Sequence, residues 1–286
     1  MHSVKVTTMK LGLTMFATDL SCDLVTVARE AETRGFHSLY VPEHTHIPTS
    51  RRTPPPTGDA ELAEEYKRTQ DPFVALAAAA AVTTRLRIGT GICLVAQRDP
   101  IVLAKEVATL DLVSGGRFVF GIGFGWNREE MASHDVAFAT RRELVREKML
   151  AMQALWSHER AAFSGEHVRF EESWSWPKPV QKPRPPVLLG GAPGPKLFAH
   201  IAEYCDGWMP IGGAGVAASL PALREAVEKA GRNPSAISVV PFGTIPSRGK
   251  LDRYASLGIT EVVLGLPSAP RDDVLRVLDD HAAWID

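Results

Sequence analysis

The chain has 286 residues, of which 45% are hydrophobic and 23% charged, and its formal net charge is −1 at pH 7. This is the ordinary composition of a soluble globular protein. No block of basic residues stands out, so nothing in the charge pattern indicates binding to nucleic acid or to a membrane surface.

The cysteines and the apolar runs indicate in which cellular compartment the protein is expected. Cys22, Cys93 and Cys205 are widely spaced, which argues against a disulfide framework and a zinc site. The first ten residues hold no apolar core of a signal peptide. The most apolar run, 73–82, is about half as long as a membrane helix requires and predicts a buried helix. We therefore expect a cytoplasmic protein.

Short apolar runs alternate with helical patterns along the chain. The first helix is predicted to begin after Ser21, a plausible N-cap, and to end at Gly35. Asp71 and Pro72 form a cap followed by a first-turn proline, and Pro100 opens another helix. Strands are predicted at 11–16, 38–41, 86–89, 117–122, 187–189, 208–211, 237–241 and 261–264. Helices are predicted at 22–35, 72–84, 100–114, 140–156, 195–204, 219–230, 249–257 and 272–285.

This pattern predicts the fold class. The predicted strands are rich in Val, Ile and Leu without polar alternation, as in strands buried on both faces of a parallel sheet. Eight strand–helix units favour an α/β fold of the (β/α)₈ TIM-barrel type, with residues 1–286 as one domain. A hairpin predicted at 163–170, around Gly165, is an insertion after the fourth strand.

In such a barrel the functional residues lie at the C-terminal ends of the strands and in the loops that follow them. After the second strand come Glu43, His44 and His46, which could satisfy loop hydrogen bonds or, with two further ligands, hold zinc. The loop that follows is long and rich in proline and threonine. Its part at 49–67 is predicted to be a mobile lid that orders on binding.

Glycines follow three other predicted strands. They lie in the segments 89–93, 121–126 and 190–195. The second has the spacing G-x-G-x-G, and no strand follows that could offer a ribose-binding acid, so a dinucleotide-binding fold is excluded. The third combines bare backbone amides with a helix start, which favours phosphate binding over a simple helix entry.

Together these segments resemble the bacterial luciferase-like superfamily, in particular its actinobacterial branch that depends on the deazaflavin coenzyme F420. The resemblance covers about residues 10–215. It is carried by Val41-Pro42-Glu43-His44, Asp71-Pro72, Leu86 to Gly91, Arg98-Asp99-Pro100, Leu103 to Glu106, Asp111 to Arg117, Gly121 to Trp126, Lys178 to Gln181, Gly190-Gly191 and Cys205 to Trp208.

The resemblance implies roles for individual residues. It places Glu43 and His44 near the deazaflavin ring, with both as catalytic candidates. It implies a cis peptide bond at Gly91-Ile92 behind the ring, and a segment at about 158–182 that often partly covers the site. The implied cofactor contacts are Glu43, His44, Gly91, Ile92, Gly121, Gly123, Gly125 and Trp126, with Gly190, Gly191, Ala192, Pro193 and Gly194 at the phosphate.

At one position this chain has a different residue from the sugar-phosphate dehydrogenases of this superfamily. They carry a proton-donating glutamate after the glycines of the fourth strand, where this chain has Trp126, with Glu129 and Glu130 one helical turn later. The departure argues against a sugar phosphate. It favours reduction of an activated C=C or C=N bond, or oxidation of a less polar alcohol.

The resemblance therefore implies an F420-dependent oxidoreductase that acts on a small organic molecule, with His44 as the group that moves a proton. Glu43 is expected to orient His44 or to hydrogen-bond the ring. Three alternatives stay open: a monooxygenase that uses flavin mononucleotide (FMN), a metal-dependent barrel hydrolase built on His44 and His46, and a non-enzymatic binding protein. A homodimer is expected because members of this superfamily often form one.

Overall fold

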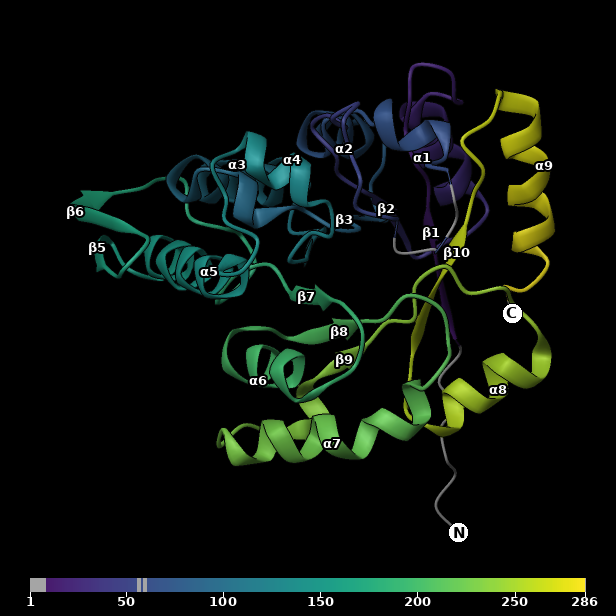
Figure 1. Ribbon diagram of the computed structural model, residues 1–286. Helices are drawn as coiled ribbons and strands as arrows, with labels where there is room; N and C mark the ends of the chain where they lie inside the picture. The colour runs from purple at the N-terminus through teal and green to yellow at the C-terminus, as the bar shows by residue number, and fades with distance from the viewer. Residues whose placement is uncertain (1–8, 56–57, 59–60, 286) are drawn as a thin grey trace, which may run out of the picture.

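The computed structural model describes residues 9–55, 58 and 61–285. In this part of the chain, eight parallel strands form a barrel with helices around it (Figure 1). The predicted TIM barrel is therefore confirmed. The barrel strands are β1 (Lys10–Thr14), β2 (Ser38–Val41), β3 (Arg87–Thr90), β4 (Phe118–Ile122), β7 (Val187–Gly190), β8 (Gly207–Met209), β9 (Ser238–Val239) and β10 (Glu261–Gly265).

Backbone hydrogen bonds close the ring. The strands pair in the order β10-β1-β2-β3-β4-β7-β8-β9, and β1 runs parallel to β10 over its full length. Just after β9, Val263 of β10 donates its N–H to the carbonyl of Pro241 at 2.9 Å, and Thr244 donates to the carbonyl of Val263 at 2.8 Å. Because all strands are parallel, the loops that follow them gather at one mouth of the barrel.

The helices follow the predicted alternation. The α-helices are α1 (Leu24–Thr33), α2 (Pro72–Ala81), α3 (Pro100–Val113), α4 (Arg128–Ser133), α5 (Arg141–Ser157), α6 (Pro195–Tyr204), α7 (Val216–Lys229), α8 (Arg248–Ser256) and α9 (Arg271–Ala282), and the short 3₁₀ turns are η1 (Glu64–Lys67), η2 (Val95–Gln97) and η3 (Pro234–Ala236). The sequence pattern did not predict α4, which has six residues.

The caps explain where the helices begin. Asp71 accepts the N–H groups of Phe73 and Val74 with its side chain, and Pro72 occupies the first turn, as predicted. For α1 the prediction is wrong: the cap is Asp23, which accepts the N–H of Thr26 at 2.8 Å. Ser21 instead belongs to a tight turn, where its hydroxyl accepts the N–H of Thr18 at 3.0 Å.

The insertion after the fourth strand is an antiparallel hairpin of β5 (Arg160–Ser164) and β6 (Arg169–Trp174), longer than the predicted 163–170. The two carboxylate oxygens of Glu147 in α5 accept N–H groups from the turn of the hairpin, at residues 166–168. The hairpin projects from the side of the body beside α5 (Figure 1). It therefore does not cover the site in the way that the resemblance implies.

The core has two layers. Inside the barrel, a small cluster is formed by Tyr40, Val119, Leu188, Met209, Val240 and Val263. A larger layer fills the space between the strands and the helices, and it includes the three cysteines as buried free thiols. None of the helices in the described part of the chain is long and apolar enough to cross a membrane.

Candidate active site

A buried histidine and a buried glutamate meet at the mouth of the barrel. His44 follows β2, and Glu130 lies in the first turn of α4, which follows β4. The Nδ1 atom of His44 lies 2.8 Å from Oε2 of Glu130, and the side chains are 6% and 1% exposed. Asn127 caps α4 by accepting the backbone N–H of Glu130 at 3.3 Å, which holds the backbone of Glu130 in the first turn of the helix.

Two polar atoms beside this pair lack a partner. They are Oε1 of Glu130 and Nδ2 of Asn127, and neither has a hydrogen bond within the described residues although both are buried. No hydrogen bond between described residues reaches Nε2 of His44. A polar group that came within reach of these atoms would therefore find both a donor and acceptors, and buried polar atoms normally have such a partner.

Aromatic rings surround the imidazole. The ring of His44 lies 5.4 Å from that of Tyr66 and 5.7 Å from that of Trp126, measured between centroids. Phe16, which follows β1, extends the cluster by its contact with Tyr66 at 4.8 Å. The guanidinium of Arg51 lies over Trp126 at 5.8 Å. The proton-transferring candidate thus lies in a mostly apolar environment with one cation at its edge.

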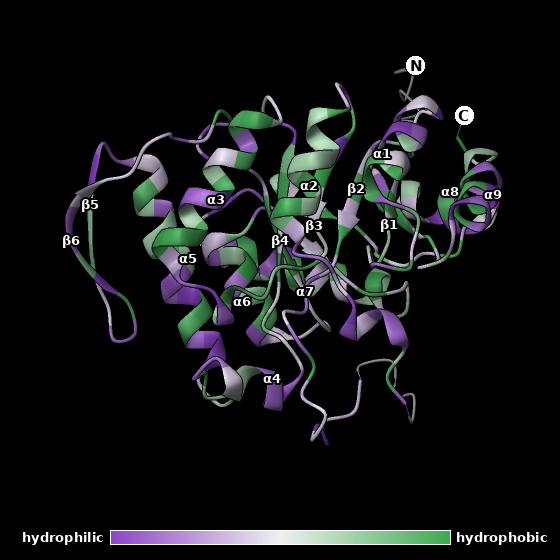
Figure 2. Cartoon of the chain, turned by 90° about the horizontal axis from the view of Figure 1, so that it is seen from above, coloured by the Kyte–Doolittle hydropathy of each residue, from purple (hydrophilic) through white to green (hydrophobic). Residues whose placement is uncertain are grey.

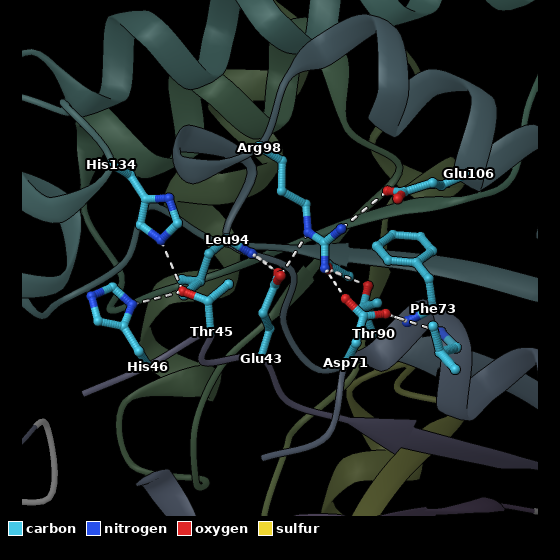
Figure 3. A network of polar contacts seen from close by, with 12 residues as sticks. Glu43, Thr45, His46, Asp71, Phe73, Thr90, Leu94, Arg98, Glu106 and His134 are labelled. Atoms are coloured by element: carbon cyan, nitrogen blue, oxygen red, sulfur yellow. Dashed lines mark hydrogen bonds and ion pairs between the residues drawn. The ribbon is translucent and has the colours of Figure 1, made fainter. Parts of the chain in front are cut away.

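Glu43 lies next to His44 in the sequence but faces a different group of residues (Figure 3). Its two oxygens accept the N–H of Leu94 and the Nε of Arg98, each at 2.6 Å. Arg98 also contacts Asp71 at 2.7 Å and Glu106 at 3.1 Å. Burial is the largest single influence on Arg98 and opposes its charge, but the neighbouring carboxylates of Glu43 and Asp71 help to outweigh it, so the pKa of the guanidinium is raised.

This ion-pair network changes the interpretation of Glu43. Both oxygens of its carboxylate are already bound, and the partner of His44 is Glu130. The expectation that Glu43 orients His44 directly is therefore not what the geometry shows. Glu43 instead anchors the loop that carries His44 to the start of η2.

The peptide bond between Gly91 and Ile92 is cis, as the resemblance implies. It follows β3, and the side chain of Ile92 lies beside Gly123 and Gly190. A Cβ on Gly123 would lie 2.5 Å from Ile92 Cδ1, and one on Gly190 would lie 3.0 Å from Ile92 Cγ2. Two of the predicted cofactor-site glycines therefore make room for Ile92. That this bulge supports a ring stays a prediction.

Other glycines predicted at the cofactor site are required for different structural reasons. A Cβ on Gly121 would lie 2.0 Å from the carbonyl oxygen of Thr90, because β3 and β4 approach closely there. Gly125 has a φ of 74° in the turn before Trp126, and Gly191 has a φ of 149°. Both conformations favour glycine over residues with a side chain.

The predicted phosphate loop lies where it was expected, between β7 and α6. Gly191 is held by the indole N–H of Trp208, which donates to its carbonyl at 3.0 Å. Ala192 and Pro193 are exposed, and Gly194 is the N-cap of α6 without a side-chain cap. The loop therefore presents backbone amides at a helix start, the arrangement that binds anions.

The geometry does not favour the metal alternative. His46 and His134 both contact the hydroxyl of Thr45, at 3.0 and 2.8 Å (Figure 3), whereas His44 pairs with Glu130. Within residues 9–55, 58 and 61–285, no three His, Cys, Asp or Glu side chains form a group that could hold a metal. Burial lowers the pKa of His134, and the nearby His46 lowers it further.

Part of the predicted lid is fastened to α4. The carboxylate of Glu129 accepts the N–H of Arg52 at 2.9 Å and the hydroxyl of Thr53 at 2.7 Å. These donors, the Thr53 hydroxyl first, lower the pKa of Glu129 to about 2. Four residues of the predicted lid, 56, 57, 59 and 60, lie outside the described residues.

The sequence analysis missed three residues of the site. Glu130 was noted only as following Trp126, Tyr66 lay in a loop without a clear period, and Arg98 was only part of a matching stretch. Capping could have located Glu130, since Asn127 precedes two glutamates, a typical start of a helix. No signal in a single sequence pairs it with His44.

Comparisons with known proteins agree with this fold. Residues 20–250 match the family model described as luciferase-like monooxygenase. An uncharacterised protein of Mycobacterium tuberculosis is 44% identical over 278 residues, which cover 96% of this chain and 98% of the relative. The F420-dependent glucose-6-phosphate dehydrogenase of Kineococcus radiotolerans is 35% identical over 161 residues, or 54% of this chain and 47% of that enzyme.

A solved structure extends the similarity to the whole fold. It is that of an F420-dependent secondary alcohol dehydrogenase in complex with an F420–acetone adduct. The TM-score is 0.75 at 18% identity, with 97% of this chain and 98% of that chain covered. With a family model that matches most of its length, this chain belongs to the luciferase-like monooxygenase family, and it resembles the F420-dependent branch.

Proposed function

We propose that this protein is an F420-dependent oxidoreductase that interconverts an alcohol and a carbonyl group on a weakly polar substrate. The observation that carries the proposal is the buried pair of His44 and Glu130 at the barrel mouth. It offers a proton-transferring group fixed in one orientation, beside the glycine-lined bulge at Ile92.

The pair has a simple chemical logic. With Glu130 ionised, Nδ1 of His44 carries a hydrogen and donates it to Oε2, so that Nε2 is left to exchange a proton with the substrate. In alcohol oxidation Nε2 takes the hydroxyl proton, and in carbonyl reduction it returns this proton to the new alkoxide. When bound, F420 supplies the ring carbon that accepts or gives the hydride.

The residues present fit such a cofactor. Gly123 and Gly190 stand where a side chain would meet Ile92 beside the cis bond, and the loop 191–194 offers amides for a phosphate. We infer that Ile92 contacts the ring and that Gly191, Ala192 and Gly194 bind the phosphate. FMN shares the ring shape and the phosphate, so the same residues would also fit the alternative cofactor.

The residues around the mouth of the barrel support the proposal that the substrate is weakly polar. Leu20, Ile211 and Ile245 follow β1, β8 and β9, and they are 59%, 79% and 79% exposed. Together with Trp126 and Tyr66 they give the entrance an apolar character. Large exposed apolar side chains beside a site are typical of binding surfaces for apolar ligands.

Cofactor titration tests the proposal. Tryptophan fluorescence is followed during parallel titrations with F420 and FMN, because Trp126 lies in the site. Trp126→Phe should remove most of the quenching. Trp176→Phe, in the remote segment after β6, is the matched control and should leave it unchanged.

Micromolar or tighter binding of F420 alone would support hydride transfer and would justify a screen of alcohols and ketones. Preference for FMN would contradict the proposed cofactor and would favour a monooxygenase. Binding of neither would contradict the enzyme proposal as a whole.

A further inference from the structure

Arg51, in the predicted lid at 49–67, lies against the aromatic rings around His44. Its guanidinium lies over the ring of Trp126, with 5.8 Å from Cζ to the ring centroid. The imidazole of His44 lies 5.7 Å from the same ring, measured between centroids. The guanidinium and the imidazole are therefore separated by no more than the sum of these two distances. A small molecule that contacts Trp126 can reach both groups.

Glu129 fixes the backbone that carries Arg51. Its carboxylate accepts the N–H of Arg52 at 2.9 Å and the hydroxyl of Thr53 at 2.7 Å. The guanidinium of Arg51 donates to the carbonyl of Thr53, which holds it close to its own backbone. Arg51 is half-buried, whereas Arg52 is exposed. Arg51 is thus held beside the site before any ligand arrives, which lowers the entropic cost of binding one.

The positive charge of Arg51 is not balanced by a carboxylate of the chain. In the described part of the chain Arg51 forms no ion pair, and the carboxylates of the neighbouring elements have other partners. These are Glu129 with residues 52 and 53, Glu130 with His44, Glu64 with Lys67 and Arg68, and Asp19 with Arg68. A guanidinium has N–H donors in a planar fork that matches a carboxylate. Arg51 can therefore bind a carboxylate that a ligand brings.

The surroundings of Arg51 change from apolar to polar over a short stretch of chain. In Figure 2, β4 is hydrophobic and α4, which follows it at the mouth, is hydrophilic. Trp126 lies between these two elements and contacts the rings of His44 and Tyr66. A ligand with an apolar body and one charged end matches this arrangement, because its body contacts the rings while its charge reaches the guanidinium.

We propose that Arg51 is a specificity-determining residue that binds a carboxylate at one end of the substrate. The inference rests on the proposed function and names its substrate class: an apolar alcohol or ketone with a carboxylate remote from the reacting carbon. One guanidinium balances the single charge of a carboxylate, whereas a phosphate monoester carries about −1.5 to −2. With the reacting oxygen at Nε2 of His44 and the carboxylate at Arg51, the substrate is held at two points and presents one carbon for reaction.

Binding of matched eight-carbon ligands tests the inference apart from the reaction. Octanoate and 1-octanol share an apolar body and differ in charge, and calorimetric titration of the full chain gives a Kd for each. The wild type should bind octanoate about tenfold tighter or more, as expected for hydrogen bonds to a charged group. Arg51→Gln should remove this preference and leave the Kd of octanol unchanged. Arg52→Gln, which removes the same charge at the adjacent exposed residue, is the matched control and should keep the preference.

Equal binding of octanoate and octanol by the wild type would overturn the proposal. So would a preference that survives in Arg51→Gln, or one that is lost equally in Arg52→Gln, because the charge would then act without a specific contact. Tighter binding of octyl phosphate than of octanoate would overturn the choice of a carboxylate. If Arg51→Gln does not fold, NMR of the wild type decides: the Nε signal of Arg51 should shift with octanoate and not with octanol, and an unshifted signal overturns the proposal.

The titrations are made on the chain saturated with F420 and again without cofactor. The same preference for octanoate is expected in both series, because Arg51 belongs to the protein and not to the cofactor site. If F420 does not bind, the proposed function fails, and the series without cofactor still decides whether Arg51 binds a carboxylate. If F420 binds and octanoate shows no preference, the function stands and this inference fails.

Discussion

The carboxylate of Glu130 reaches the imidazole of His44 across 86 residues of sequence, with 2.8 Å between Oε2 and Nδ1. The preceding residue, Glu129, points away and holds Arg52 and Thr53 of the lid segment. One short helix thus orients the proton-transferring candidate on one side and fastens the segment over the site on the other. Neighbouring glutamates with different partners make matched controls for each other.

Replacing His44 with alanine should reduce turnover much more than it weakens cofactor binding. General acid–base catalysis contributes about 10²- to 10⁴-fold, so kcat should fall by that factor. The Kd for F420 from fluorescence titration should change by less than about threefold, because the bulge and the phosphate loop are untouched. Equal turnover in the variant would rule out His44 as the proton-transferring group.

Glu130→Gln should disturb the tautomer of His44 while the fold stays intact. Nitrogen-15 NMR of the histidine ring should show a hydrogen on Nδ1 in the wild type and a mixture of tautomers in the variant. Turnover should fall by about tenfold or more, as is typical when the group that orients a catalytic histidine is lost. Glu129→Gln should leave the His44 signals unchanged. The same tautomer in wild type and E130Q would contradict the orienting role.

Arg98→Ala should cost more stability than the loss of an ordinary surface ion pair. It leaves the carboxylate of Glu43, 3% exposed as a residue, without its cation, and breaking a buried pair costs about 3–5 kcal/mol. Arg160→Ala is the control, because Arg160 and Glu172 are 58% and 60% exposed and such pairs contribute about 1 kcal/mol or less. Urea unfolding gives both free energies. Similar losses in the two variants would contradict a buried network.

Gly121→Ala should lower the stability of the fold, whereas Gly123→Ala should weaken cofactor binding. The new methyl at position 121 would meet the backbone oxygen of Thr90, so the strands must shift, and the free energy of unfolding should fall by about 1–3 kcal/mol. At position 123 it would meet the side chain of Ile92, at 2.5 Å from Cδ1 and 3.0 Å from Cγ1, and no backbone atom, so a change of the Ile92 rotamer can relieve the contact. Gly123→Ala should therefore keep its stability but weaken F420 binding. The reverse pattern, measured by unfolding and titration, would contradict this packing.

The bonds from Glu129 should hold the lid segment over a wide pH range. The folded pKa of Glu129 is about 2, below the ordinary value of 4.5, so its contribution is complete above about pH 4.5 and is lost as the pH falls toward 2. Hydrogen exchange at Arg52 and Thr53, corrected for intrinsic rates, should stay slow from pH 6 to pH 4. In Glu129→Gln these amides should exchange faster at pH 6, and trypsin should cut at Arg51 and Arg52 more readily. An unchanged variant would show that other contacts hold the segment.

The sequence predicts the barrel well because its signals are local. Asp71-Pro72 and the proline at position 100 mark helix starts by capping, and the apolar strand runs are short and distinct. The first helix start was misjudged because Ser21 and Asp23 are both good caps, and only the geometry of the Thr18 turn decides between them.

The site is less predictable because its contacts are not local. The cis bond at Gly91-Ile92 and the position of His44 followed from family resemblance. The pairing of His44 with Glu130, and of Glu43 with Arg98, depends on how three consecutive strand–helix units dock. Six residues are too few to show a helical period, so the sequence marks α4, which carries Glu130, only by its cap at Asn127.

The pairing of His44 with Glu130 also makes the chemistry conditional on tertiary structure. His44 follows β2, Glu130 lies beyond β4, and β3 runs between them. If the chain kept its helices but lost the packing of these strands, His44 and Glu130 would both still be present but would no longer be in contact. The environment of the His44 ring is therefore a reporter of native packing in the first half of the barrel.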